Sequence, residues 1–266
     1  MKEINLDELK LIQIEILDEV HMLCTENNIA YFLSSGTLIG AVRHKGYIPW
    51  DDDIDLYMPR KDYERFLELF NKKSKNFRAL SLNTDKLYAM PYAKVERLGT
   101  RMIEQVDNPM KMGVNIDIFP VDSVPDDENE RVKYFARIQR KRNALTLKNV
   151  SIRRGRNFLK NIALILGKIM LLPFSLRHLA EKLDSIVDKN NTDSKYVCNV
   201  ILGNGVKSIF KRDAIKSSVD IEFEGKFYKT MAGFDEYLTK TYGDYMELPP
   251  EEKRISHHKF TAYWID

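Results

Sequence analysis

The chain has 266 residues, of which 44% are hydrophobic and 30% charged, and its net charge is +3. This composition is typical of a soluble globular protein, and so small a net charge argues against nucleic acid as a partner. The two cysteines, Cys24 and Cys198, can form neither a disulfide scaffold nor a four-cysteine zinc site and favour a reduced, cytoplasmic setting, while the charged N-terminus lacks the apolar core of a secretory signal.

The first predicted elements are a long helix and a short strand. Apolar residues recur at helical spacing from 5 to 28, with Asn5 as the N-cap. Residues 31–33 predict a strand that leads into a turn at 34–37. A helix is expected to begin near Thr37 and to end near His44, before a strand that follows Pro49.

This next strand is acidic on one side only. Because strand side chains alternate, Asp53 and Asp55 should share one face, with Cα atoms about 7 Å apart, while Ile54 and Leu56 share the other. Partly buried carboxylates repel each other, and a cation relieves that cost. The pair therefore predicts a site for Mg²⁺, with Mn²⁺ as a substitute, because this hard ion accepts few carboxylates together with substrate phosphates.

Residues that could bind phosphate surround the acidic strand. Ser35, Gly36 and Thr37 precede a helix, where free N–H groups attract anions. Arg43 and Lys45 at the other end of that helix could neutralise phosphate charge. The alternative is that these two cations only complement the helix dipole.

The chain then predicts a helix over 61–71, strands over 77–83 and 88–96, and a strand over 100–104 that extends the same sheet. Lys94, in the second of these strands, is a further candidate for binding substrate.

A later strand over 114–119, ended by Pro120, presents Asn115 and Asp117 on one face. Asp117 is the best candidate for a third carboxylate that orients the nucleophile or binds the metal, and Asp122 is the second choice. The alternative for Asp117 is a turn cap at the end of a strand.

From residue 126 the character of the chain becomes basic and helical. One long helix is expected over 127–149, and one or two more over 157–190. The apolar segment 158–174 is interrupted by Lys160, Lys168 and Pro173, so it is too short to span a membrane. It predicts either an interfacial helix on an anionic membrane face, through 157–174, or a buried helix of the same region.

The last third returns to mixed structure. A strand is predicted over 196–202, a hairpin turn at 224–225 and a helix over 234–242. The polar tail that follows offers Lys253, Arg254, His257 and His258 as phosphate contacts. For the histidines a structural role is the alternative, and only one of two adjacent side chains can easily reach a given site.

At this point a family resemblance is visible. Residues 36–55 closely resemble the signature of the LicD family of phosphotransferases, and residues 115–120 and 242–258 are similar to two further blocks of that family. The resemblance implies an α+β fold, with a nucleotidyltransferase-like mixed β-sheet and flanking helices, to which the chain from residue 126 adds a basic helical lobe. The expected division is a catalytic core at 1–125, the lobe at 126–200, and a segment at 201–266 that completes the core and the active site.

The resemblance also implies an activity. Asp53 and Asp55 would hold a divalent metal, and a phospho-alcohol would pass from a CDP-activated donor to a glycan hydroxyl, with release of CMP. Phosphocholine from CDP-choline is the best-known case, and the related fukutin-related branch uses CDP-ribitol. The expected acceptor is a lipid-linked precursor of the lipopolysaccharide or teichoic-acid type, which would place the enzyme at the inner membrane face.

Other functions stay open. CDP-ribitol or CDP-glycerol could be the donor. A nucleotidyltransferase that uses ATP on a small molecule would need the same metal pair but would release pyrophosphate. A non-catalytic protein would bind nucleotide without turnover.

Overall fold

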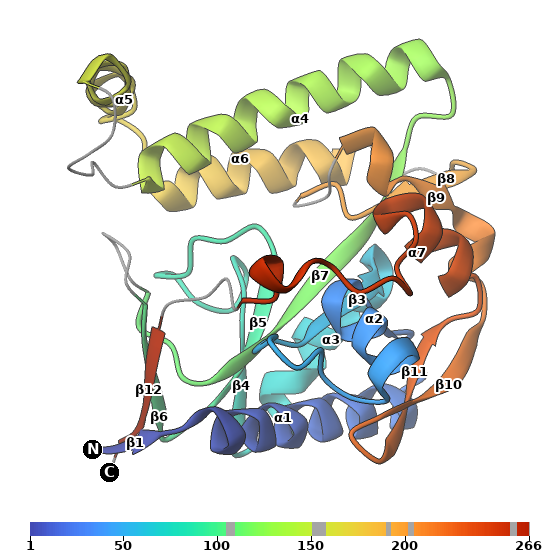
Figure 1. The fold of residues 1–266 in the computed structure, drawn as a ribbon. Helices are drawn as coiled ribbons and strands as arrows, with labels where there is room; N and C mark the ends of the chain where they lie inside the picture. The colour runs from blue at the N-terminus through green and yellow to red at the C-terminus, as the bar shows by residue number, and fades with distance from the viewer. Residues whose placement is uncertain (105–109, 151–157, 190–192, 202–204, 256–259, 266) are drawn as a thin grey trace.

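The computed structural model describes residues 1–104, 110–150, 158–189, 193–201, 205–255 and 260–265. Its centre is a seven-stranded mixed sheet with the order β2-β3-β7-β5-β4, to which β8 is added through β7 and β9 through β8 (Figure 1). β3 runs parallel to β7, and the other described pairs of this sheet are antiparallel. The strands are β2 (Phe32–Leu33), β3 (Asp55–Pro59), β4 (Phe77–Leu80), β5 (Ala93–Arg97), β7 (Asn115–Val124), β8 (Tyr196–Cys198) and β9 (Phe210–Lys211).

Two helices pack on this sheet, α1 (Leu6–Glu26) and α3 (Arg60–Lys73), and both contact β7. In α1 the residues Leu9, Ile16 and Val20, spaced for one helical face, are almost fully buried. The Asn5 side chain accepts a hydrogen bond from the N–H of Glu8 at 2.9 Å, which confirms the predicted N-cap.

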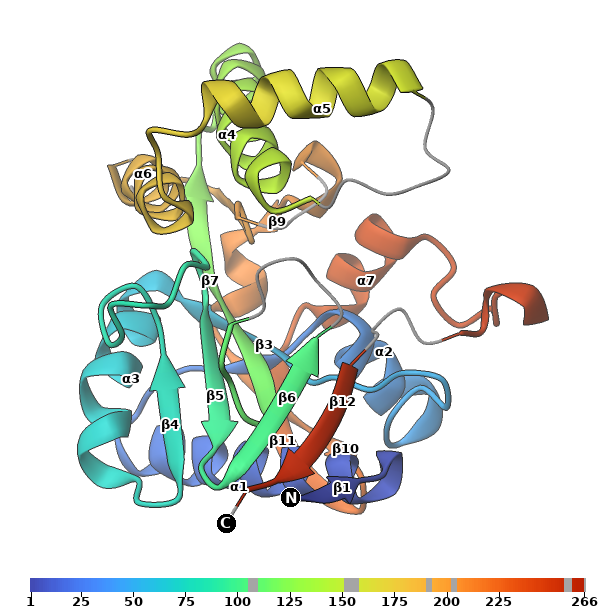
Figure 2. The same cartoon turned by 90° about the vertical axis from the view of Figure 1, so that its left-hand side faces the viewer.

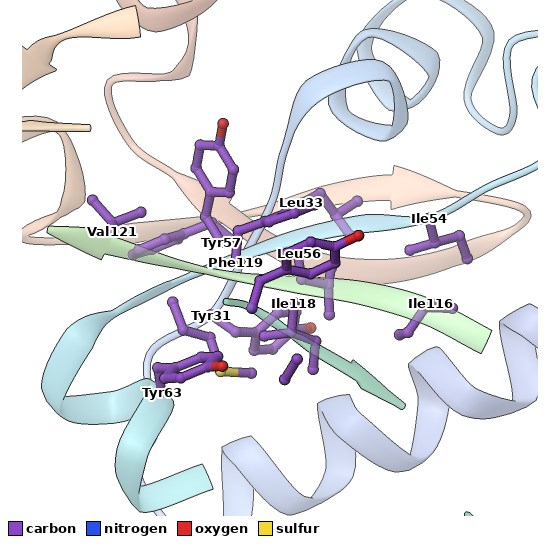
Figure 3. Packing of buried hydrophobic residues seen from close by; sticks show 14 of the residues in the cluster. Tyr31, Leu33, Ile54, Leu56, Tyr57, Tyr63, Ile116, Ile118, Phe119 and Val121 are labelled. Carbon is purple, nitrogen blue, oxygen red and sulfur yellow. The ribbon is translucent and has the colours of Figure 1, made fainter. Parts of the chain in front are cut away.

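The core around β3 and β7 decides which way the acidic side chains point. Ile54, Leu56, Ile116 and Ile118 are at most 1% exposed and pack among the buried aromatic residues (Figure 3). The register pairs Leu56 with Ile118, so both side chains leave the same face of the sheet. The neighbouring positions in each strand therefore leave the opposite face, as the alternation predicted.

β7 is longer than predicted, because it continues through Pro120 to Val124, and the expectation that this proline ends the strand is wrong. β5 pairs with β7 only as far as Ile118, and β8 begins to pair with it at Asp122. Pro120 therefore lies between two partners, where its missing N–H removes no ladder bond to either of them.

β6 (Thr100–Glu104) does not extend the central sheet, and that prediction is also wrong. It pairs with β12 (Phe260–Trp264), which pairs in turn with β1 (Lys2–Ile4) in a separate three-stranded sheet (Figure 2). The two ends of the chain thus lie side by side.

The described residues of the basic region form three helices, α4 (Glu128–Asn149), α5 (Phe158–Met170) and α6 (Leu176–Lys189), as predicted. α4 packs against both others, and α4 and α6 lie above the end of β7 in Figure 1. Among the helices in the described ranges, none is long and apolar enough to cross a membrane. The fold is therefore the predicted α+β class, a mixed sheet with flanking helices and a basic helical lobe. The division at 125 and 200 stays a prediction.

A buried ion pair joins this lobe to the sheet. Asp122, at the end of β7, accepts two hydrogen bonds from the guanidinium of Arg60 at 2.7 and 2.8 Å, and the side chains are 0% and 4% exposed. Arg60 also donates to Asp184 of α6 at 3.1 Å. Asp122, the second candidate for a third active-site carboxylate, therefore belongs to an ion-pair network that links α3, β7 and α6.

The C-terminal part confirms the predicted hairpin and helix. β10 (Ser218–Phe223) pairs with β11 (Lys226–Met231), and Glu224 and Gly225 at the turn have φ of 52° and 72°. Two positive φ angles match the twist of a two-residue hairpin. β11 is bound to the central sheet by a hydrogen bond from the Thr230 hydroxyl to the carbonyl of Leu33 at 3.1 Å, and α7 (Phe234–Tyr242) follows.

Candidate active site

The N-terminus of α2 (Ser35–His44) is fixed against the first residue of β3 by backbone-directed hydrogen bonds. The N–H of Ser34 donates to the carbonyl of Asp55 at 3.0 Å, and its hydroxyl donates to the same oxygen at 3.2 Å. The N–H of Asp55 donates to the hydroxyl of Thr37 at 2.8 Å. The free N–H groups of this helix start therefore lie beside the acidic strand, as the sequence predicted.

Three charged side chains form a row across three adjacent strands. The register pairs Asp55 of β3 with Asp117 of β7, and Asp117 with Lys94 of β5. Side chains at paired positions leave the same face, and neighbouring strands are about 5 Å apart. Lys94 donates a short hydrogen bond to Asp117 and another to the side-chain oxygen of Asn115 at 3.1 Å. The structure thus brings together residues that lie far apart in the sequence.

The loop before β3 adds three more carboxylates. Asp51, Asp52 and Asp53 each offer an oxygen, and these three oxygens lie within 4.8 Å of one another. Gln13 of α1 fixes the loop to the sheet, because its amide donates to the backbone carbonyl of Asp52 at 2.9 Å and to that of Asn115 at 3.3 Å. Asp53, which the sequence assigned to the metal, is therefore one member of a convergent group that begins at Asp51.

Gly36 allows the acidic loop to approach the helix start. A Cβ atom at this position would lie 2.6 Å from Oδ2 of Asp51, which is too close for any side chain to be tolerated without movement. The carboxylate of Asp51 therefore lies directly over the first turn of α2. Glycine provides that space without displacing the carboxylate.

The electrostatics of Asp55 confirm that these groups share one environment. Its pKa is raised well above the usual value, first by burial and then by the negative charges of Asp53, Asp117 and Asp51, while the charge of Lys94 opposes the rise. Removing a proton from Asp55 is therefore costly in the protein alone. A bound cation would lower that cost.

Ser35 has a backbone conformation that a residue other than glycine rarely adopts, with φ of 50°. Such a conformation costs on the order of 1 kcal/mol or more and persists only where the surroundings impose it. Here the serine side chain lies close enough to Tyr57, Tyr237 and Tyr242 to influence the pKa of each, and the hydroxyl oxygens of the first two are 3.3 Å apart. The helix start is thereby connected to α7.

Arg43 and Lys45 lie at the other end of α2. Arg43 donates to the backbone carbonyls of Tyr245 and Glu247 at 2.9 and 3.2 Å, so its guanidinium holds the segment after α7. Lys45 caps the helix with φ of 61°, and its carbonyl accepts a hydrogen bond from Glu224 at 2.8 Å. A helix of 10 residues places its two ends about 15 Å apart. Lys45 therefore lies at the end of α2 that is far from the row formed by Asp55, Asp117 and Lys94.

The structure describes two of the four predicted tail residues, Arg254 and Lys253. Arg254 lies over the ring of Trp50, with its guanidinium carbon 5.7 Å from the centroid, directly before the acidic loop. The pKa of Arg43 is lowered, first by its burial and then by the positive charge of Arg254, so the two guanidinium groups are near each other. Lys253 is exposed in the short 3₁₀ helix Glu251–Lys253. His257 and His258 lie outside the described residues.

The sequence did not single out Asp51 as a ligand or the tyrosines around Ser35. The run of three aspartates was visible, but in a loop no periodicity says which of them converge. Two of the tyrosines, Tyr237 and Tyr242, belong to α7, some two hundred residues after Ser35, and no local pattern joins these segments.

Comparisons with known proteins find similarity over the residues of this site. The family described as LicD/FKTN/FKRP, nucleotidyltransferase domain, matches residues 28–150, which include α2, the acidic loop and the three strands of the charged row. The lipopolysaccharide cholinephosphotransferase LicD of Haemophilus influenzae is 33% identical over 274 residues, 99% of this chain and 99% of that protein. An uncharacterized protein of Rickettsia typhi is 40% identical over 70 residues, 26% of this chain and 23% of its own.

Proposed function

The chain belongs to the LicD family of phosphotransferases, and from this premise we propose that it transfers phosphocholine from CDP-choline to a hydroxyl of a cell-surface glycan and releases CMP. The likeness to the cholinephosphotransferase extends over the whole length of both chains. The observation that carries the proposal is the row Asp55–Asp117–Lys94 beside the start of α2. An acidic group next to free backbone N–H groups suits a diphosphate and a divalent cation together.

The residues present fit Mg²⁺, or Mn²⁺ in its place. Oxygen atoms are the ligands that this ion prefers, and those of Asp51, Asp52 and Asp53 converge within 4.8 Å. The raised pKa of Asp55, due first to burial and then to the neighbouring carboxylates, is the mark of a site that lacks positive charge. We propose Asp53 and Asp55 as the principal ligands, with Asp51 as a third. When bound, the ion would neutralise the charge of the donor diphosphate.

The chain's own residues supply the remaining steps. The acceptor hydroxyl attacks the phosphorus next to choline, the bond from that phosphorus to the oxygen of CMP breaks, and CMP leaves with the electron pair. We propose that Asp117 accepts the proton of the acceptor hydroxyl, and its hydrogen bond from Lys94 supports this by fixing the direction of the carboxylate. A role for Asp117 as a metal ligand is the alternative.

Phosphate binding is assigned to the start of α2. The N–H groups of Ser35, Gly36 and Thr37 are held beside Asp55, and a helix start favours negative charge. Arg254 stacks near the acidic loop and can add positive charge there. Arg43 acts at longer range, since its guanidinium holds the segment that leads to Arg254.

The test measures CMP release with CDP-choline, Mg²⁺ and a lipopolysaccharide-type acceptor. Asp53→Ala and Asp55→Ala should each lose turnover by about a thousandfold, the order expected when charge stabilisation at the reacting group is removed. Asp7→Ala, which removes an exposed carboxylate from the first turn of α1, is the matched control and should be unaffected. Retained turnover in both site variants would reject the proposal.

The same assay separates the other functions. Faster release of CMP from CDP-ribitol or CDP-glycerol would identify that compound as the donor and leave the assignment of the site unchanged. Pyrophosphate release from ATP would indicate a nucleotidyltransferase. Thermal stabilisation by a nucleotide with no product from any donor would indicate a binding protein.

A further inference from the structure

The outer face of α5, defined here as Ile162, Ile165, Leu166, Ile169 and Met170, is apolar and open to solvent. These positions follow the i, i+3, i+4, i+7, i+8 spacing of a single helical face. Their exposed fractions range from 38% to 78%. Leu172 and Phe174, directly after the helix, are exposed as well. Soluble proteins rarely leave such a continuous apolar surface without a partner.

The opposite face of α5 is the one that holds the helix to the protein. Leu164 is buried, and a Cβ atom at Gly167 would meet the side chain of Leu147 at 2.6 Å. The Lys168 ammonium donates to the carbonyl of Lys148 at 3.3 Å, and the Lys148 ammonium donates to that of Leu171 at 2.8 Å. The helix is therefore fixed in place with its outer face turned away from α4. Figure 2 shows α5 lying across the end of the molecule opposite α1.

The stretch of sequence that contains α5 carries charge of one sign. Residues 131–180 contain thirteen lysine and arginine residues and no aspartate or glutamate, although the whole chain carries a net charge of only +3. Lys160 at the start of α5 and Lys141 of α4 are exposed. The region therefore attracts an anionic surface. A second copy of this chain on the same face would bring two strongly basic regions together, and nucleic acid would offer no apolar surface to the outer face.

We propose that α5 lies flat on an anionic lipid bilayer, with its outer face among the acyl chains at the headgroup boundary and the basic residues of α4 and α5 against the lipid phosphates. The 13 residues of α5 give a length of about 20 Å, which is too short to span a bilayer but ample for an interfacial helix. Apolar burial and charge attraction act together in this arrangement. It would hold the enzyme where lipid-linked acceptors are found, but it does not depend on the proposed reaction.

The test is co-sedimentation of the full chain with vesicles of phosphatidylcholine containing about one third phosphatidylglycerol, a fraction high enough to give an anionic surface. Pure phosphatidylcholine vesicles are the neutral comparison. The proposal predicts that the chain binds the anionic vesicles and that this binding weakens with salt. Binding to the neutral vesicles should be weaker by about tenfold or more. Equal binding to both, or no binding to either, would overturn it.

Two variants separate the outer face from apolar exposure in general. The triple change Ile162→Ser, Leu166→Ser and Ile169→Ser should weaken vesicle binding by about tenfold or more, since three exposed apolar side chains are removed and no inner-face contact is touched. Leu11→Ser, Leu87→Ser and Phe227→Ser remove apolar side chains elsewhere that are more exposed than those three, and they should leave vesicle binding unchanged. Equal loss in both triples would refute the assignment to α5. A dimer of the wild type that only the first triple dissociates would assign this face to a second copy instead.

Discussion

The contact between Gly36 and Asp51 gives the sharpest prediction about the site. In Gly36→Ala the new Cβ atom would lie 2.6 Å from Oδ2 of Asp51, and the carboxylate would have to move by about 0.8 Å to reach an ordinary contact distance. Displacement of a reacting or metal-binding group by about 1 Å can cost a hundredfold in rate, or about 2.7 kcal/mol of transition-state stabilisation.

The same change should not weaken the fold. Gly36 lies within α2, and alanine favours a helix over glycine by about 1 kcal/mol. The atom it meets is the end of a side chain that can turn away. We therefore expect a melting temperature equal to or above that of the wild type, together with a kcat/KM about a hundredfold lower with CDP-choline.

A double-mutant cycle tests whether the loss passes through Asp51. In an Asp51→Ala background, where the methyl group meets no carboxylate, Gly36→Ala should cost little further activity. If Gly36→Ala alone retained activity within about twofold of the wild type, or if the two losses added fully, the assigned contact would play no part in the reaction.

Three further predictions concern buried charge. Asp55→Asn should raise the thermal stability of the metal-free protein while abolishing transfer, because the variant removes a carboxylate whose pKa is raised by burial and by Asp53, Asp117 and Asp51; a lower melting temperature without metal would contradict this. Arg60→Met should lower the free energy of unfolding in urea by about 3–5 kcal/mol, since it leaves Asp122 buried without its guanidinium partner, whereas Lys216→Met, in an exposed pair with Asp213, should leave that free energy nearly unchanged. The pKa of His21 is lowered, first by burial and then by Lys229, so the unfolded chain binds the proton more readily. Stability should therefore fall as the pH drops below about 6.5, and it should fall less in His21→Gln when both are melted across that range.

Local sequence patterns were sufficient to predict the strands that carry Asp55 and Asp117. Alternation in 53–56 and 115–118 predicted which side chains enter the core, and the buried Ile54, Leu56, Ile116 and Ile118 confirm it. The hairpin at Glu224 and Gly225 was equally visible, because those residues tolerate positive φ.

Long-range pairing was not visible. β1 is only three residues long, and its partner β12 lies at the other end of the chain. β6 was placed in the wrong sheet for the same reason, since its partner is also β12. No local period encodes which strand pairs with which.

Charge alone was a poor guide to the phosphate ligands. Arg43 was chosen because it is cationic and follows the helix, yet its guanidinium is engaged by two backbone carbonyls after α7. Asp51 was not selected as a ligand, yet its carboxylate lies over Gly36. In both cases the tertiary contacts decide where the charged group can act.

The central claim, that the carboxylates before and within β3 hold a divalent cation against the donor diphosphate, is tested most directly by crystals grown with Mn²⁺ and CDP-choline. The account predicts an anomalous peak between Asp53 and Asp55, close to Asp51, with the diphosphate between that peak and the start of α2. An ordered donor bound elsewhere, or the two carboxylates facing separate surroundings with no peak between them, would contradict it.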